Sequence, residues 1–177
     1  MRALLLITSF LLINVCCGQD STTAVYINEA IQKIERRLAN AIVETKDTTI
    51  FDDSLQKGPF LTIHTEFYTD PQTMFLDKIV EKSLYKKTTT ELTIYFLGNQ
   101  PIRFTNRQWQ GSTLSVDFDI YYMNDNSVFV TKRGSLDGVP DCNMFLKWCY
   151  QLRSQYFNII EEYNQTFAKG KNKSRKT

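Results

Sequence analysis

The sequence predicts a mainly β domain, with a run of antiparallel strands between an N-terminal helix and a long C-terminal helix. Three observations predict this order. Residues 24–45 and 141–167 repeat apolar side chains every three or four positions, as amphipathic helices do. The segments between them alternate apolar and polar residues, as half-buried strands do. Strands and helices do not alternate along the chain, which argues against a parallel α/β sheet.

The first 18 residues read as a targeting segment. Met1 and Arg2 precede an apolar run of about a dozen residues, which ends at the small residues Cys17 and Gly18. One basic residue before a short apolar run is typical of a secretory signal peptide. We expect cleavage after Gly18 or Cys17 and a secreted, extracellular protein without a membrane span. A retained membrane anchor is the alternative.

Residues 19–168 have the length of one domain with its own core. The tail 169–177, KGKNKSRKT, carries five basic residues and no acidic one, whereas the whole chain has a formal charge of +2. The domain is therefore mildly acidic and its tail basic. We expect a disordered, solvating tail, with binding to an anionic glycan or membrane surface as the alternative, and no nucleic-acid partner.

Two cysteines remain after the signal segment, Cys142 and Cys149. In an oxidising compartment they are candidates for a disulfide, but seven residues of unbroken helix span about 10 Å, too far for the bond. Either the helix starts after Cys142 or the two do not pair. One histidine and no CxxC spacing give no expected metal site. The sequons at Asn164 and Asn172 predict glycosylation.

The first helix, 24–45, has an apolar face on one side and charged residues on the other. Its apolar residues are Ile27, Ile31, Ile34, Leu38 and Ile42. This pattern predicts a helix packed on the domain, capped by a residue of the Ser-Thr-Thr run that precedes it. The polar residues 46–58 predict a loop.

The next strand, 60–68, has one apolar face and one mixed face, and it stops at Asp70 and Pro71. The mixed face carries His64, Glu66 and Tyr68. Residues 72–87 fit a helix or a strand, and periodicity leaves both open. The β-branched and aromatic segment 90–97 predicts a strand buried on both faces.

The remaining strands are expected at 101–109, 113–123 and 128–130. The strand over 113–123 alternates most clearly, with its apolar side from Leu114 to Tyr122. The Asn-Asp-Asn-Ser turn that follows it predicts a hairpin. Residues 134–140 read as a loop, and Asp141 is a suitable cap for the last helix. The apolar stripe of that helix comprises Phe145, Trp148, Leu152, Tyr156, Ile159, Tyr163 and Phe167.

Carboxylates beside aromatic residues are the most informative site signal. Glu66 shares a strand face with Tyr68, and Asp117 and Asp119 share one with Tyr121. If such faces line a barrel, they favour an organic cation through a charge-assisted hydrogen bond and cation–π contact. The alternative is that these acids face water. The expected ligand-binding residues are Glu66, Tyr68, Trp109, Asp117, Asp119 and Tyr121.

No nucleophile elbow, glycine-rich phosphate loop or metal-spaced cluster occurs. His64 is the one histidine, and a lone histidine on a strand is more often structural than catalytic. We therefore expect a protein that is not an enzyme and has no cofactor.

Three segments carry a family resemblance. GPFLTIHTEFYTDP, DKIVEKSLYKKTTTELTIYFLGN and SLDGVPDCNMFLKWC occur in this order between residues 58 and 149. They resemble the first barrel strand, the lysine-rich hairpin and the helix-leading end of the tick salivary lipocalins, the histamine-binding-protein family. The chain departs from that family at Ile79 and Ser127, where cysteines are usual, so the usual disulfides cannot form and the chain resembles a divergent member.

The resemblance implies an eight-stranded antiparallel barrel around a cavity for one small ligand. It implies a monomeric salivary protein that sequesters a host mediator, either a biogenic amine such as histamine or serotonin or a lipid. Two other readings stay open. One is a cystatin- or NTF2-like α+β fold, in which the first helix lies across a curved sheet. The other is a module that binds a host protein and encloses no ligand.

Overall fold

The computed structural model describes residues 21–51, 59–134 and 140–174. In these residues, seven antiparallel strands lie between two long helices, so the predicted mainly β fold with a helix at each end is confirmed. The elements in chain order are α2 (Ser21–Arg37), η1 (Leu38–Asn40), β1 (Ile42–Phe51), β2 (Pro59–Thr69), β3 (Leu76–Tyr85), β4 (Thr88–Leu97), β5 (Gln100–Gln110), β6 (Thr113–Met123), β7 (Asn126–Gly134) and α3 (Cys142–Ser174).

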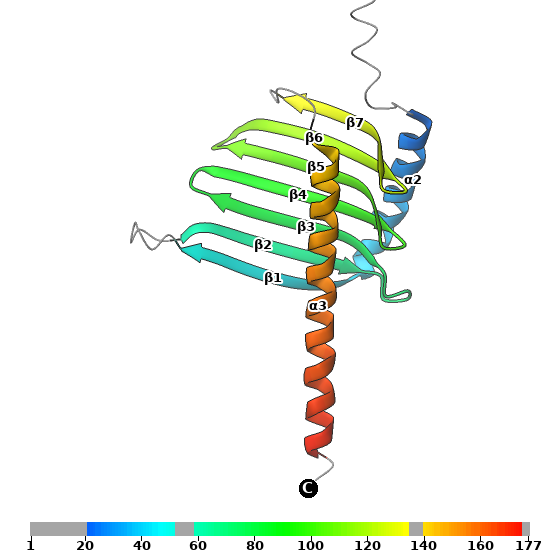
Figure 1. Ribbon diagram of the computed structural model, residues 1–177, viewed down its shortest axis with the longest axis vertical. Coiled ribbons are helices and arrows are strands. Elements are labelled where there is room, and N and C mark those ends of the chain that lie inside the picture. Colours follow the sequence, from blue (N-terminus) through cyan, green and yellow to red (C-terminus); the bar gives the residue numbers. More distant parts are fainter. Residues whose placement is uncertain (1–20, 52–58, 135–139, 175–177) are drawn as a thin grey trace, which may run out of the picture.

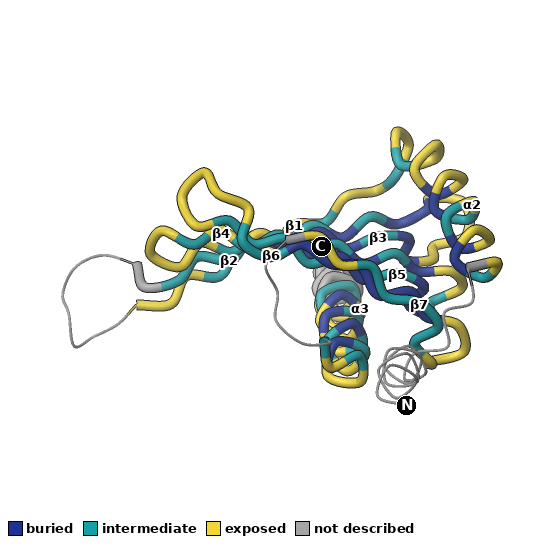
Figure 2. Tube along the Cα trace, turned by 90° about the horizontal axis from the view of Figure 1, so that it is seen from above, coloured by how far each residue is buried: buried dark blue, intermediate teal, exposed yellow. Residues whose placement is uncertain are grey.

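Each strand pairs with the next strand in the sequence, so the sheet is a simple meander from β1 to β7. The sheet is not closed: β1 and β7 form its two edges among the described residues. In Figure 1, α3 runs across one face of this sheet and nearly perpendicular to the strands. Figure 2 shows α2 on the opposite face, at one end of the strands. The closed barrel that the resemblance implies is therefore not shown.

The main core lies between α3 and the sheet face beneath it, which we call the helix-covered face. Phe104 of β5 packs against Phe145 and Trp148 of α3, with ring centroids 4.8 and 6.5 Å apart. Phe67 of β2 contacts Tyr156, whose hydroxyl shares a 2.7 Å hydrogen bond with Thr69. These contacts hold α3 to strands far apart in the sheet.

The apolar side of β6 was predicted correctly. Phe118, Ile120 and Tyr122 are buried beneath α3, and Val116 packs beside them, whereas Leu114 at the strand end is exposed. The hydroxyl of Tyr122 donates a 2.9 Å hydrogen bond to the carbonyl of Cys142 at the first turn of α3.

A second, smaller core lies under α2 on the other face. Ile27, Ile31 and Ile34 are buried against Ile102 and Tyr121, with Leu38 at the margin. The predicted apolar stripe of this helix is therefore confirmed up to Leu38.

The predicted end of the first helix was wrong. The helix ends at Arg37 and one 3-10 turn follows, after which Ile42 begins β1 instead of extending the stripe. β1 is rich in β-branched isoleucine, valine and threonine, which favour extended backbone. For the same reason residues 46–51 belong to a strand rather than to the predicted loop 46–58. Residues 52–58 lie outside the described residues.

The ambiguous segment 72–87 contains strand β3, preceded by a turn at residues 71–73. That turn is held by Asp70, whose carboxylate accepts a 2.9 Å hydrogen bond from the backbone N–H of Gln72. The predicted hairpin at Asn124 is confirmed. Asn124 and Asp125 have φ values of 50° and 64°, the left-handed conformation that a two-residue β-hairpin turn requires.

The last helix starts where the sequence predicts and ends later. The carboxylate of Asp141 accepts hydrogen bonds from the backbone N–H groups of Asn143 and Met144, so Asp141 caps α3. The helix continues past the expected end at residue 167 and takes in most of the basic tail, ending at Ser174. Within the described residues, neither helix is long and apolar enough to cross a membrane. The predicted signal segment 1–18 lies outside them.

Candidate functional site

The side of the sheet away from α3 carries a belt of alternating charges, and we call this side the ionic face. The belt crosses the strands from one edge to the other. Its members, from β1 to β7, are Asp47, His64, Glu66, Lys82, Glu91, Arg103, Arg107, Asp117, Asp119 and Arg133. Most of the predicted ligand-binding residues lie on this face.

Glu66 and Tyr68 come together as the sequence predicts. The hydroxyl of Tyr68 donates a 2.8 Å hydrogen bond to Glu66 Oε2, and this bond lowers the pKa of Glu66. Partial burial, together with the same carboxylate, raises the pKa of Tyr68 to about 12. The Nε2 of His64 lies 3.4 Å from the other oxygen of Glu66.

His64 connects two carboxylates across the first two strands. Its Nδ1 lies 2.6 Å from Asp47 Oδ1, and the hydrogen bonds to Asp47 and then to Glu66 raise the pKa of the imidazole. His64 is therefore held as a cation to a higher pH than usual. In the described residues both side-chain hydrogen bonds of its ring go to carboxylates.

Asp117 and Asp119 do not face water, so that reading of the sequence was wrong, and a role for them in ligand binding stays a prediction. Both carboxylates are buried, and arginines of the same chain neutralise them. Arg133 donates to both aspartates at 2.8–3.1 Å, and Arg103 donates to Asp119 at 3.0 Å. Burial opposes the ionisation of Asp119, but hydrogen bonds from Thr105 and Arg103 outweigh burial and lower its pKa.

Tyr121 and Trp109 lie in other surroundings, and a role for them in ligand binding stays a prediction. Tyr121 is buried under α2, where Arg103 lies 5.3 Å from its ring centroid and Phe129 packs edge-on. Trp109 lies near the end of β5, half-buried and paired with Thr89 of β4.

An acid–aromatic cage of the predicted chemistry does occur, but the protein fills it with its own lysine. The ammonium of Lys78 lies 5.8 Å from the Tyr68 ring centroid and 5.2 Å from that of Tyr95, and it donates to Glu35 of α2 at 2.8 Å. Burial opposes ionisation of Glu35, but the hydrogen bond from Lys78 lowers its pKa. No sequence pattern indicates this cage, because its members come from four elements, α2, β2, β3 and β4.

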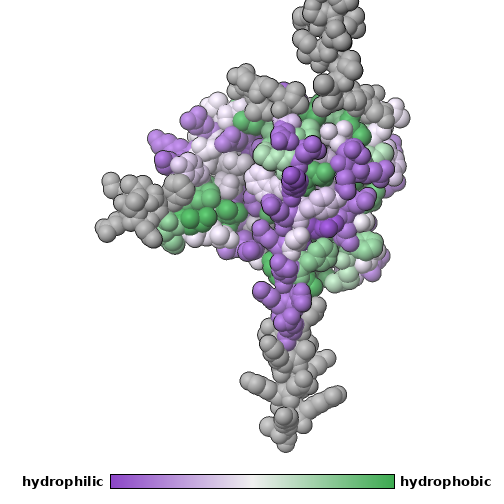
Figure 3. Space-filling model, in the orientation of Figure 1, coloured by the Kyte–Doolittle hydropathy of each residue, from purple (hydrophilic) through white to green (hydrophobic). Residues whose placement is uncertain are grey.

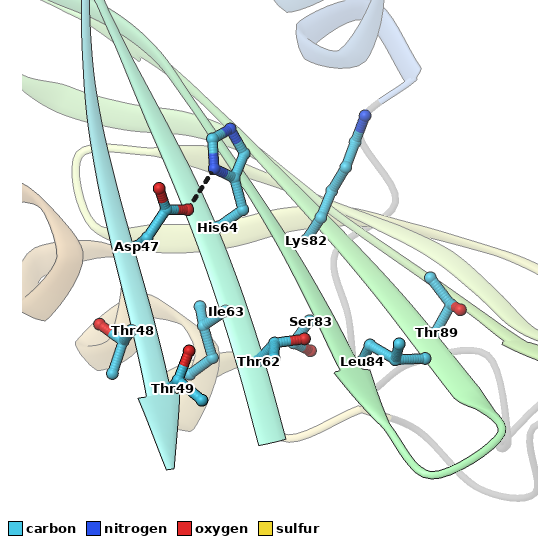
Figure 4. Close-up of a pocket in the computed structure, with 10 residues that line it drawn as sticks. All are labelled: Asp47, Thr48, Thr49, Thr62, Ile63, His64, Lys82, Ser83, Leu84 and Thr89. Carbon is cyan, nitrogen blue, oxygen red and sulfur yellow. Dashed lines mark hydrogen bonds and ion pairs between the residues drawn. The ribbon is translucent and has the colours of Figure 1, made fainter. Parts of the chain in front are cut away.

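A hollow of about 410 Å³ lies over the outer ends of β1 to β4, as Figure 4 shows. Asp47, His64 and Lys82 lie at one end of it, and threonines with Leu84 lie at the other. Its lining residues are Asp47, Thr48, Thr49, Thr62, Ile63, His64, Lys82, Ser83, Leu84 and Thr89. Asp47 was not among the predicted site residues, because it fell in the predicted loop 46–58.

The predicted disulfide is not formed. Cys142 is the first residue of α3, so Cys149 lies two turns along the same helix, and the two do not form a disulfide with each other. Burial raises the pKa of Cys149 to about 12. The sequons at Asn164 and Asn172 fall within the described backbone of α3 but outside the described side chains, so glycosylation stays a prediction.

Comparison with protein-family models, with curated proteins and with solved structures found no match to this chain. The resemblance to the tick salivary lipocalins therefore stays a prediction from the sequence. Among the side chains that the structure describes, no three histidine, cysteine or acidic groups gather in a way that could hold a metal ion.

Proposed function

We propose that the protein is a secreted, non-enzymatic binding protein that captures a small organic amine of the histamine or serotonin type in the hollow on the ionic face. The observation that carries the proposal is the carboxylate of Asp47. It is 77% exposed at the rim of the hollow, and it pairs there with the ring of His64, which we expect a ligand to displace.

An ammonium group entering the hollow would take the place of the imidazole on Asp47. A charge-assisted hydrogen bond between an ammonium and a carboxylate is among the stronger polar contacts available to a small ligand. The hydroxyls of Thr49 and Thr62 can accept the remaining ammonium hydrogens, and Leu84 offers an apolar contact for the ring of the amine. Glu66 lies next along β2 and adds negative charge.

The lining favours an amine over a lipid. Eight of its ten lining residues are threonine, serine, aspartate, histidine or lysine. The apolar space beneath α3 is filled with packed rings, including Phe104, Phe118, Phe145 and Trp148. A fatty acyl chain would have to displace these rings, at a cost of core packing.

The order of elements, a helix, an antiparallel meander and a helix, supports a lipocalin-like assignment for a protein with this role. In this proposal the open face of the sheet holds the ligand, so the sheet need not close into a barrel. Capture of a host mediator needs no catalysis, because one protein molecule removes one ligand molecule.

Calorimetry on the chain from residue 19 to 177 with histamine, serotonin and a fatty acid tests the proposal. We expect a one-to-one complex with an amine that weakens about tenfold or more in Asp47→Asn, as loss of a charged hydrogen-bond partner predicts. The matched control is Asp125→Asn, which removes the same charge from the exposed β6–β7 turn and should change nothing. Binding of the fatty acid alone, or no binding of any of the three, would refute the amine.

The pH dependence gives a second test. Protonated His64 competes with the amine for Asp47 and Glu66, and its pKa is raised above the usual 6.5. Amine affinity should therefore rise as the pH passes through the raised pKa, and stay high until the amine itself loses its proton near pH 9–10. In His64→Gln this rise should disappear. A rise of equal size in His64→Gln would show that another group controls binding.

A further inference from the structure

The edge strand β1 is open to pairing along its outer side. Within the described residues β2 pairs with its inner side, and no strand pairs with the other. It is ten residues long and contains no proline, and its only strand-to-strand irregularity lies at its last residue. Long, regular edge strands of this kind are templates for pairing with another strand.

An apolar strip lies beside this edge, on the helix-covered face but to one side of α3. Ile50 of β1 pairs with Leu61 of β2, and Thr48 pairs with Ile63, so these side chains share the face of Phe67. Ile50 is 46% exposed, and Leu61 and Ile63 are half-buried. Figure 3 shows an apolar area at this end of the strands, beside the residues drawn in grey.

Helix α3 runs past the edge of the sheet. Gln155 marks its crossing of β1, where Lys46 donates a 3.5 Å hydrogen bond to it. Tyr156, Ile159 and Ile160 still pack on the core of their own chain, and from Glu161 to Ser174 the helix then extends about 20 Å at roughly 1.5 Å per residue. Figure 1 shows this half of α3 projecting beyond β1, with no described strand of its own chain beneath it. A projection of that length would span several strands at about 4.8 Å spacing.

We propose that a second copy of this chain covers all three features in a symmetric dimer. The two β1 strands pair antiparallel across a two-fold axis perpendicular to the sheet, which makes one continuous sheet. The projecting half of each α3 then lies on the helix-covered face of the other copy, over its Ile50 strip. The interface is isologous, because each copy supplies one helix and one strip.

The charges on β1 and the width of a helix select the register. A two-fold axis that passes beside one residue of β1 places that residue opposite its own copy, and we call that residue the centre. A centre at Glu44, Lys46 or Asp47 would place two like charges opposite each other. A centre at Thr45 sets Lys46 opposite Glu44 of the second copy. The two α3 helices would then cross β1 about 7 Å apart, closer than the roughly 10 Å diameter of a helix.

A centre at Thr48 meets both conditions. It sets Lys46, where α3 crosses, opposite Ile50 of the second copy, so each helix lies over the apolar strip. The two helices are then about 14 Å apart and lie side by side. Centres nearer either end of β1 pair fewer residues. The proposal therefore replaces the monomer expected from the sequence with a dimer centred on Thr48.

Cysteine cross-linking tests the register directly. In Thr48→Cys, the two introduced residues face each other with Cα atoms about 4.5–5.5 Å apart, within the range for a disulfide. Mild oxidation should convert most of the protein to a covalent dimer. The matched control Thr45→Cys places its two cysteines about 20 Å apart and should stay monomeric on a denaturing gel. The unsubstituted chain controls for Cys142 and Cys149. Preferential cross-linking through position 45 would overturn the register.

Sedimentation of the full mature chain over a range of concentrations tests the dimer itself. We expect Ile50→Glu to raise the dimer dissociation constant about tenfold or more, because it places a charge beneath the second copy's helix. Leu84→Glu is the control, since Leu84 is 49% exposed on the ionic face, outside the interface. A monomer at all concentrations, or equal weakening by both variants, would overturn the proposal. No ligand is involved, so the outcome is independent of amine binding.

Discussion

Asp119→Ala should cost this protein more stability than any exposed charge substitution. Asp119 is 1% exposed and lies in the centre of the ionic belt. Its two carboxylate oxygens accept hydrogen bonds from Arg103, Thr105, Thr131 and Arg133, at 2.7–3.0 Å. Removing the carboxylate leaves these donors without this acceptor and removes the ion-pair partner of Arg103.

Breaking a buried ion pair by removing one partner typically costs 3–5 kcal/mol. The structure places Asp119→Ala near the lower end of that range. Arg133 keeps two hydrogen bonds to Asp117, and it is half exposed, so water can solvate it. Arg103 is more buried and loses its aspartate. We therefore expect a loss of about 3 kcal/mol in the free energy of unfolding.

Urea unfolding at pH 7, followed by circular dichroism, measures this loss. The control is Asp47→Ala, an exposed acid on the same face, which should cost less than about 1 kcal/mol. The pKa of Asp119 is lowered in the folded protein, so its contribution is present above its unfolded pKa, near 3.9, and is lost as the pH falls through the folded value. The difference in free energy of unfolding between wild type and Asp119→Ala should become smaller below about pH 4. A loss no larger than that of the control would refute the buried network as a source of stability.

Three further predictions concern buried or enclosed groups. Burial raises the pKa of Glu81, so its charge destabilises the fold once the pH exceeds its unfolded pKa. Glu81→Gln should therefore raise the free energy of unfolding at pH 7 by about 1 kcal/mol, measured by urea unfolding. Lys78→Ala should open the cage of Tyr68 and Tyr95 to tetramethylammonium, seen as saturable quenching of tyrosine fluorescence that wild type lacks. In the native chain from residue 19, buried Cys149 should resist a thiol reagent at pH 8, and it should react after denaturation. If Cys149 were in a disulfide, its thiol would react in neither state.

Much of the fold could be predicted because most strands of this meander carry their own alternating pattern or turn in the sequence. The period of two in 113–123 and the turn at Asn124 match β6 and its hairpin closely. The stripe from Ile27 to Leu38 likewise predicted which side of the first helix is buried. Such patterns report which side of an element is buried, and do not report what buries it.

The other features of the fold and the site depend on contacts between residues far apart in the sequence, which no local pattern contains. The helical spacing at Ile42 continued by coincidence after the helix had ended, which hid β1 and with it Asp47. Asp117 and Asp119 were recognised as notable acids, but Arg133, which pairs with them, comes from the neighbouring strand β7. Whether seven strands close into a barrel or lie open depends on twist and on what covers each face, and the sequence alone does not fix that balance.

The sequential order of the strands also determines when the protein can fold. Neighbouring strands are joined by short turns, so the sheet can assemble by adding one hairpin after another, with little loop-closure entropy at each step. The helix that covers the sheet follows all seven strands in the sequence, and its contact from Tyr156 to Thr69 spans 87 residues. Until α3 has left the ribosome, Phe67, Phe104 and Phe118 have nothing to cover them. We expect the nascent sheet to be prone to aggregation until α3 packs on it.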